Sequence, residues 1–132
     1  MHIMDKVWDP LRRKEVALTP EEGVRQWFIS VLRDELEVPE HLMGSEVAME
    51  FGGKKWRADI VVYRRDLTPA VIVECKKPEV KLTGRVLDQA LRYHSLLDAE
   101  WLIVTNGNDT RAFRRLDGHF GPALNLPKYC EL

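Results

Sequence analysis

The chain lacks several features that would place it quickly in a class of protein. It has only two cysteines, Cys75 and Cys130, which do not form a CxxC pair, so we expect a cytoplasmic protein with reduced thiols. No apolar run approaches the roughly 18 residues that a membrane span needs, and the first residues lack the apolar core of a signal peptide. The sequence therefore predicts neither a membrane partner nor secretion.

Common catalytic signatures are missing as well. The sequence has no GxSxG motif and no GxxxxGK[ST] phosphate loop, which argues against a serine hydrolase of that type and against an ATP-driven motor. A zinc site is not expected either, because no HxxxH spacing or paired cysteine accompanies the scattered histidines, His2, His41, His94 and His119.

Neither sign of charge is in excess, since the net charge is −1. A protein that binds nucleic acid by bulk electrostatics alone would carry a clear positive excess. The distribution is uneven, however: residues 19–50 contain 8 acidic and 2 basic residues, whereas residues 52–92 contain 10 basic and 5 acidic. The second segment is compatible either with a local cationic surface that holds phosphates or with an ordinary solvated surface.

What is present is a chain of ordinary globular composition. Its 132 residues are 45% hydrophobic and 31% charged, enough to bury a core without disulfides or a structural metal. We expect a single domain over residues 1–132, made of an N-terminal β arm (1–18), a core (19–120) and a tail without periodicity (121–132). Alternation predicts strands at 45–51, 54–63, 70–76, 101–105 and 110–114, and helical spacing predicts helices from Thr19 to before Pro39 and over 83–98.

The central stretch is a predicted hairpin around the turn formers of Arg64–Pro69. If its strands close symmetrically about this connection, Tyr63 faces Ala70 and the register continues back until Asp59 faces Glu74. Directly opposed side chains on antiparallel strands lie close together, so these two carboxylates would repel each other. A bound divalent cation would turn that repulsion into attraction.

Alternation along the second strand places Glu74 and Lys76 on one face and Cys75 on the other, where the thiol is expected in the core. Asp59, Glu74 and Lys76 are thus candidate catalytic residues, with the two carboxylates as hard oxygen ligands for Mg²⁺ or Mn²⁺. Such a set suits phosphodiester hydrolysis. The alternative is a solvated strand end, where a Glu-x-Lys sequence often occurs by chance.

The first predicted helix offers a third candidate metal ligand. Thr19 has the position of an N-cap, Pro20 that of the first helical residue, and Glu22 that of the acidic partner in a capping box. Projected on a helix, Glu21 falls inside the apolar stripe and Glu22 at its edge. Glu21 is therefore a candidate for the metal site, although an exposed Glu21 that complements the helix dipole is the alternative.

Gln89 and Tyr93 are four residues apart on the second predicted helix, so they lie on one side of it at the margin of its apolar stripe. An amide and a phenol at this place are suited to support a catalytic residue or to contact a DNA phosphate or base. The alternative is an ordinary amphipathic boundary.

Taken together, these parts resemble the PD-(D/E)xK nuclease superfamily, and most closely the N-terminal nuclease domain of type I restriction enzyme R (endonuclease) subunits. The likeness covers nearly the entire chain. It rests on the segments Trp8–Leu11, Thr19–Glu22 with Val24–Gln26, Asp59–Tyr63, Ile72–Pro78 and Leu102–Gly107, together with the QxxxY spacing of Gln89 and Tyr93. Ala58 stands where the superfamily usually has proline before its aspartate.

The resemblance implies an α/β fold of the α+β kind, with a restriction endonuclease-like core in which helices flank a central mixed β-sheet. It implies a Mg²⁺-dependent (or Mn²⁺-dependent) DNA endonuclease in which Asp59 and Glu74 bind the metal and Lys76 assists the attacking water. Gln89 and Tyr93 would serve DNA contact or site support. DNA, restriction-modification subunits and a second copy of the chain are the implied partners.

Two other functions stay open at this point. R subunits follow this domain with a helicase motor that the sequence lacks, so a nuclease-fold adaptor that binds DNA or a protein without cutting is one alternative. A repair or Holliday-junction nuclease on the same fold is another. The sequence does not decide whether the chain stands alone or belongs to a larger protein.

Overall fold

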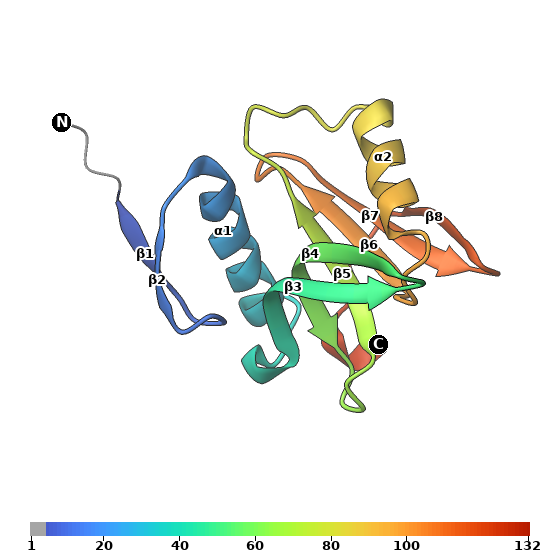
Figure 1. The fold of residues 1–132 in the computed structure, drawn as a ribbon, viewed down its shortest axis with the longest axis horizontal. Helices are drawn as coiled ribbons and strands as arrows, with labels where there is room; N and C mark the ends of the chain where they lie inside the picture. The colour runs from blue at the N-terminus through green and yellow to red at the C-terminus, as the bar shows by residue number, and fades with distance from the viewer. Residues whose placement is uncertain (1–4) are drawn as a thin grey trace.

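The computed structural model describes residues 5–132 as a two-stranded hairpin, a six-stranded sheet and two α-helices (Figure 1). The first four residues of the predicted β arm, among them His2, lie outside the described residues. The strands are β1 (Lys6–Asp9), β2 (Lys14–Ala17), β3 (Met43–Phe51), β4 (Lys54–Tyr63), β5 (Pro69–Cys75), β6 (Trp101–Thr105), β7 (Thr110–Leu116) and β8 (His119–Ala123). The helices are α1 (Pro20–Asp34) and α2 (Gly84–His94), with short 3-10 helices at Glu40–Leu42 and Tyr129–Glu131.

The large sheet is mixed, with the strand order β3-β4-β5-β6-β7-β8. Neighbouring strands are antiparallel except β5 and β6, which are parallel. A parallel pair needs a crossover connection, and α2 lies in that connection. This arrangement confirms the predicted α+β fold with a mixed sheet flanked by helices.

The two helices cover opposite faces of the sheet, because alternate residues of β4 and β5 pack into two different cores. One core lies under α1 and includes Phe28, Leu32, Ile60, Val62 and Val73. The other lies under α2 and the turn that follows it, and includes Val61, Ile72, Ala90, Leu97 and Leu102. The β1–β2 hairpin lies on the far side of α1 from the sheet (Figure 1).

The central hairpin has the predicted register over most of its length. Ile60 pairs with Val73 and Val62 with Val71, as symmetric closure requires. The prediction is wrong at the turn, where Tyr63 pairs with Pro69 rather than Ala70 because a β-bulge shifts the register by one residue. The bulge lies at the far end of the strands from the carboxylates.

Both helices begin where the sequence predicts and end earlier. Thr19 Oγ1 accepts a hydrogen bond of 3.1 Å from the backbone N–H of Glu22 and so caps α1. Thr83 Oγ1 caps α2 in the same way, accepting a hydrogen bond of 3.3 Å from the backbone N–H of Val86. Helix α1 stops at Asp34, since the chain turns there and Glu37 takes a φ of 60°. Helix α2 stops at His94 rather than continuing to residue 98.

The C-terminal segment is more ordered than its composition suggests. Strand β8 extends to Ala123 and pairs with β7, so residues 121–123 belong to the sheet and not to a tail. Pro122 hides this strand from pattern analysis, yet proline is tolerated on an edge strand because no donor is needed on the open side. Beyond it, Tyr129 donates its N–H to Leu36 O at 2.8 Å and its hydroxyl to Tyr63 O at 3.0 Å.

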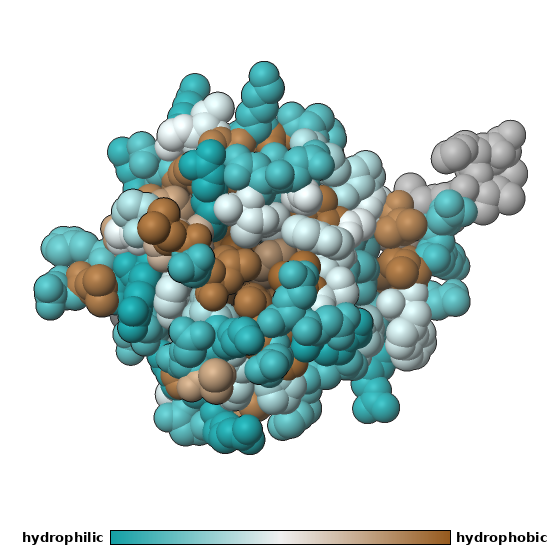
Figure 2. Space-filling view, turned by 180° about the vertical axis from the view of Figure 1, so that it is seen from behind, coloured by the Kyte–Doolittle hydropathy of each residue, from teal (hydrophilic) through white to brown (hydrophobic). Residues whose placement is uncertain are grey.

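On the face seen from behind, polar residues predominate and hydrophobic residues gather in the middle (Figure 2). The exposed large hydrophobic side chains come from different parts of the described chain: Trp8, Leu18, Trp27, Leu67, Tyr93, Leu96, Leu116 and Leu124. Neither helix among residues 5–132 has the length and hydropathy needed to span a bilayer.

Candidate functional site

A small pocket of about 280 Å³ opens where β4 and β5 stop pairing with each other, between the start of α1 and the end of α2. Its lining contains four residues that the sequence nominates for catalysis or metal binding, and Tyr93 with them. The complete lining is Glu21, Arg57, Asp59, Glu74, Cys75, Lys76, Tyr93 and His94. Asp59, Glu74 and Lys76 thus lie in one pocket, and Glu21 lies there with them.

Asp59 is held at the junction of the two strands. Its Oδ2 accepts a hydrogen bond of 2.6 Å from the backbone N–H of Cys75, and its Oδ1 lies 3.6 Å from the guanidinium of Arg25. Burial raises the pKa of Asp59, and the neighbouring carboxylates of Glu21 and Glu74 raise it further. The hydrogen bond and Arg25 oppose this rise without cancelling it.

Glu74 is bound on both of its oxygens. Lys76 Nζ lies 2.9 Å from Oε2, and His94 Nε2 lies 3.0 Å from Oε1. Burial raises the pKa of Glu74, but the hydrogen bonds from His94 and Lys76 outweigh it and hold the pKa below its ordinary value. Cys75 points into the core beneath α1, as predicted, and burial raises the pKa of its thiol.

The two glutamates at the start of α1 differ from the prediction in burial. Glu22 is buried against the N-terminal hairpin, with a side chain 9% exposed, while the side chain of Glu21 is 40% exposed. The predicted capping box is also corrected, because the Glu22 carboxylate contacts Arg12 at 2.6 Å and Gln26 at 3.1 Å. Glu21 nevertheless lines the pocket, and its Oε1 lies 3.8 Å from Arg25.

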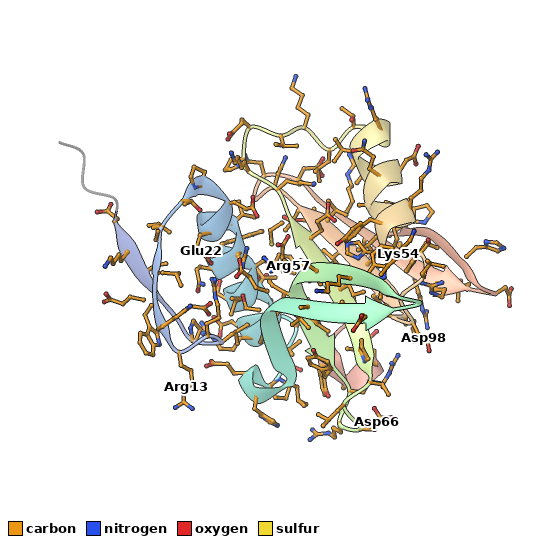
Figure 3. The ribbon with its side chains drawn as sticks, in the orientation of Figure 1. Arg13, Glu22, Lys54, Arg57, Asp66 and Asp98 are labelled. Carbon is orange, nitrogen blue, oxygen red and sulfur yellow. The ribbon has the colours of Figure 1, made fainter. Side chains whose placement is uncertain are left out.

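A network of buried charges supports the pocket from the side of the N-terminal hairpin. Arg12 forms ion pairs with Asp9, Glu22 and Glu46. Arg25, whose side chain is 5% exposed, lies within 4 Å of carboxylate oxygens of Glu22 and Glu46 as well as those of Glu21 and Asp59. Glu22 lies on the side of α1 that faces the hairpin (Figure 3). The hairpin is therefore linked to Asp59 through two arginines.

Gln89 and Tyr93 have different surroundings although they share one side of α2. Tyr93 lines the pocket, and its hydroxyl accepts a hydrogen bond of 3.0 Å from the backbone N–H of Arg57. Its ring packs edge-on against Trp56 and His94, with centroid distances of 4.8 Å for each pair. Gln89 is exposed and lies outside the lining of the pocket.

Three residues of the site were missed in the sequence, although each had a local signal. His94 lies four residues after Ala90, on the buried side of α2. Arg25 lies one turn before Ile29 on the inward side of α1. Arg57 precedes Asp59 by two residues, and side chains two apart on a strand share a face. In each case the spacing indicated which side of the helix or strand the residue lies on. It gave no reason to expect a polar group of the site beside that residue.

The carboxylates fit a divalent cation of the Mg²⁺ type. Among residues 5–132, no group of three or more His, Cys, Asp or Glu side chains is arranged to hold a metal by itself. Mg²⁺ usually takes only one or two protein carboxylates and keeps water or substrate phosphates in its other positions. Asp59 and Glu74 supply that number, and a cation would offset the effects of burial and of the neighbouring carboxylates that raise the pKa of Asp59.

The chain has a structural relative of known fold. A solved fragment attributed to the HsdR subunit of a type I restriction enzyme from Vibrio vulnificus YJ016 superposes with a TM-score of 0.62 and is 21% identical. The match covers 85% of this chain and 24% of that chain, so this chain spans about a quarter of the relative's length. A comparison with curated proteins gives no match.

A family match covers most of the sequence. Residues 20–125 match the family described as type I restriction enzyme R protein N terminus (HSDR_N). The match begins at the first residue of α1 and ends just after β8, so it includes every residue that lines the pocket. The chain therefore belongs to the family of type I restriction enzyme R protein N-termini.

Proposed function

We propose that this domain is a Mg²⁺-dependent (or Mn²⁺-dependent) endodeoxyribonuclease of the PD-(D/E)xK type, without an ATPase motor in this chain. The observation that carries the proposal is the common pocket of Asp59, Glu74 and Lys76, in a chain that belongs to a restriction enzyme family. Two carboxylates and an ammonium at one point on the sheet form a set suited to hydrolysing a phosphodiester.

Asp59 and Glu74 would hold the metal, and Glu21, the third candidate ligand, would reach it through a bound water. When bound, the cation supplies a Lewis acid that polarises a phosphoryl oxygen and lowers the pKa of water. The hydrogen bond from Cys75 N–H fixes the Asp59 carboxylate, and His94 fixes that of Glu74. These contacts position both carboxylates before substrate arrives, which reduces the reorganisation that binding requires.

Lys76 would act on the attacking water or on the developing negative charge. Its Nζ is 2.9 Å from Glu74, and its side chain is 35% exposed, so it reaches both the carboxylate and the solvent of the pocket. An ammonium group has three donors. One can remain on Glu74 while another orients a water or donates to a phosphate oxygen.

The direct test is cleavage of plasmid DNA by the purified chain with Mg²⁺ or Mn²⁺. Wild-type protein should convert supercoiled DNA to nicked or linear forms, whereas Glu74→Gln should lose at least about a hundredfold in rate, since the change removes a charge that acts on the metal. Glu79→Gln is the matched control, because Glu79 is exposed and lies outside the pocket. Uncut DNA with a folded wild-type protein, or equal loss in both variants, would contradict the proposal.

A second function has its own supporting observation. Both oxygens of Glu74 are engaged by protein groups, so metal binding must displace or share one of these contacts. This arrangement favours a nuclease-fold adaptor that binds DNA or a partner protein without cutting. An adaptor would bind DNA with equal affinity in wild type and Glu74→Gln and would cut with neither.

DNA is the proposed substrate, and restriction-modification subunits or a second copy of the chain are the proposed partners. Light scattering with and without DNA tests the homodimer. Comparing branched with linear DNA in the cleavage assay separates a restriction-type enzyme, which should not prefer junctions, from a Holliday-junction or repair nuclease.

A further inference from the structure

Arg57 differs from the other arginines near the pocket because, among the described residues, no carboxylate is in direct contact with its guanidinium, although Glu46 attracts it from a longer distance. Arg12 and Arg25 are each surrounded by carboxylates. Within residues 5–132, Arg57 forms no ion pair, although it is one of the two basic residues other than His94 that line the pocket. The other, Lys76, is held by Glu74 at 2.9 Å. Arg57 is thus the cation of the lining that remains available to an anion.

The backbone of Arg57 is fixed although its side chain is exposed. Its N–H donates to Tyr93 Oη at 3.0 Å, and the Tyr93 ring is in turn packed between Trp56 and His94. Arg57 lines the same pocket as Asp59, two residues along β4. A pre-positioned backbone lowers the ordering cost when the guanidinium takes up a ligand.

The charge of the pocket explains why such a cation is needed. Asp59, Glu74 and Glu21 give the lining three carboxylates, which repel the phosphates of an approaching nucleic acid strand. The planar guanidinium matches a phosphate group with two parallel N–H donors, a geometry that lysine does not offer. An arginine at the rim of a carboxylate pocket therefore offsets the repulsion where the strand must enter.

We propose that Arg57 binds a backbone phosphate of the DNA strand held in this pocket, and that Tyr93 is the positioning residue that fixes Arg57 in place. This inference rests on the proposed function, because it takes DNA as the ligand of the site. It gives Tyr93 a role through the backbone of β4 rather than through direct contact with DNA, and it gives exposed Gln89 no part in that support.

The test compares the binding of a short labelled DNA duplex by wild type, Arg57→Gln and Lys54→Gln over a range of salt concentrations. Lys54 is the matched control, since it is exposed, lies on the same strand nearer the β3–β4 turn (Figure 3) and is outside the pocket. Each phosphate contact contributes about 0.9 to the slope of log affinity against log salt on duplex DNA. Arg57→Gln should lower the slope by about this amount, with a several-fold loss of affinity, and Lys54→Gln should not.

The measurements are made in EDTA and again with Ca²⁺, so that binding is separated from cleavage. An unchanged slope for Arg57→Gln in both conditions, the same loss in both variants, or no binding by wild type would overturn the inference. Arg57→Lys should keep the slope and lose part of the affinity, because the charge remains and the paired donors do not. If wild type fails to cut DNA but shows this dependence on Arg57, the nuclease proposal fails and the inference stands.

Discussion

The Asp59 carboxylate accepts a hydrogen bond of 2.6 Å from the backbone N–H of Cys75, just beyond the last paired residues of β4 and β5, Ile60 and Val73. A side chain thus joins the two strands where their backbone pairing ends. Because Glu74 immediately precedes Cys75, the same contact keeps the two carboxylates beside one pocket. The stability and the chemistry of the site are therefore coupled through Asp59.

Asp59→Asn should stabilise the metal-free protein at neutral pH. The pKa of Asp59 is raised by burial and by the carboxylates of Glu21 and Glu74, so its ionised form opposes folding. Asparagine keeps an oxygen that can accept from Cys75 N–H and removes the charge. We expect a gain of about 0.5–2 kcal/mol in the free energy of unfolding, measured by denaturant titration in EDTA. A loss of similar size would contradict this description of Asp59.

The control for this variant is Asp98→Asn. Asp98 is exposed and lies away from the pocket (Figure 3), so removing its charge should leave the free energy of unfolding within about 0.5 kcal/mol of wild type. If both variants gained the same free energy of unfolding, the stabilisation would come from the change in net charge and not from the surroundings of Asp59.

Arg25→Met should destabilise the protein strongly. The guanidinium is buried between Glu22, Glu46 and Asp59, and its loss leaves carboxylates without a counter-ion. Breaking a buried ion pair by removing one partner costs about 3–5 kcal/mol, which denaturant unfolding would detect. Arg33→Met on the same helix is the control, since Arg33 is exposed and its ion pairs with Asp34 and Glu40 are screened by solvent, so the free energy of unfolding should stay close to that of wild type.

More of the fold than of the site could be predicted from the sequence, because the fold depends on local patterns and the site on contacts between distant segments. Strand and helix patterns depend on local periodicity, so the register from Ile60–Val73 to Val62–Val71 followed from the sequence. The bulge at Tyr63 did not, because it depends on how the turn packs. Nor did the burial of Glu22 in place of Glu21, which depends on Arg12, a residue from the hairpin that no helical projection contains.

The N-terminal hairpin should become less stable at acidic pH, because Asp9 takes up a proton there. Burial raises the pKa of Asp9, but the hydrogen bonds from Arg12 and from the N–H of Leu11 outweigh it and lower the pKa below its ordinary value. A lowered folded-state pKa gives stability that is complete above the ordinary pKa and is lost as the pH falls through the folded-state value. Asp9→Asn should therefore be less stable than wild type by about 1–3 kcal/mol at neutral pH.

This difference should shrink as the pH falls below about 4, where Asp9 takes up a proton first in the unfolded chain and then, at its lower pKa, in the folded protein. Unfolding free energies measured from neutral pH into acid would show it. Asp5→Asn, a change at an exposed position beside the hairpin, should follow the wild-type curve. A difference between wild type and Asp9→Asn that stays constant with pH would exclude the ionised Asp9–Arg12 pair as its source.

Tyr93→Phe should separate the hydrogen bond of the tyrosine from its packing. The ring contacts with Trp56 and His94 remain, while the acceptor for Arg57 N–H is lost. We expect a cost of about 0.5–1.5 kcal/mol in unfolding free energy and a several-fold weaker affinity for DNA. Gln89→Ala should change neither quantity, because Gln89 is exposed and outside the pocket. Equal effects of the two substitutions would argue for a shared role in DNA contact.

The most direct test of the central claim is calorimetric titration of the purified domain with Mn²⁺. Wild type should bind the ion in this pocket, and Asp59→Asn, which is expected to remain folded, should not. Binding that is absent from wild type, or that is equal in wild type and Asp59→Asn, would contradict the claim that Asp59 and Glu74 form a metal site.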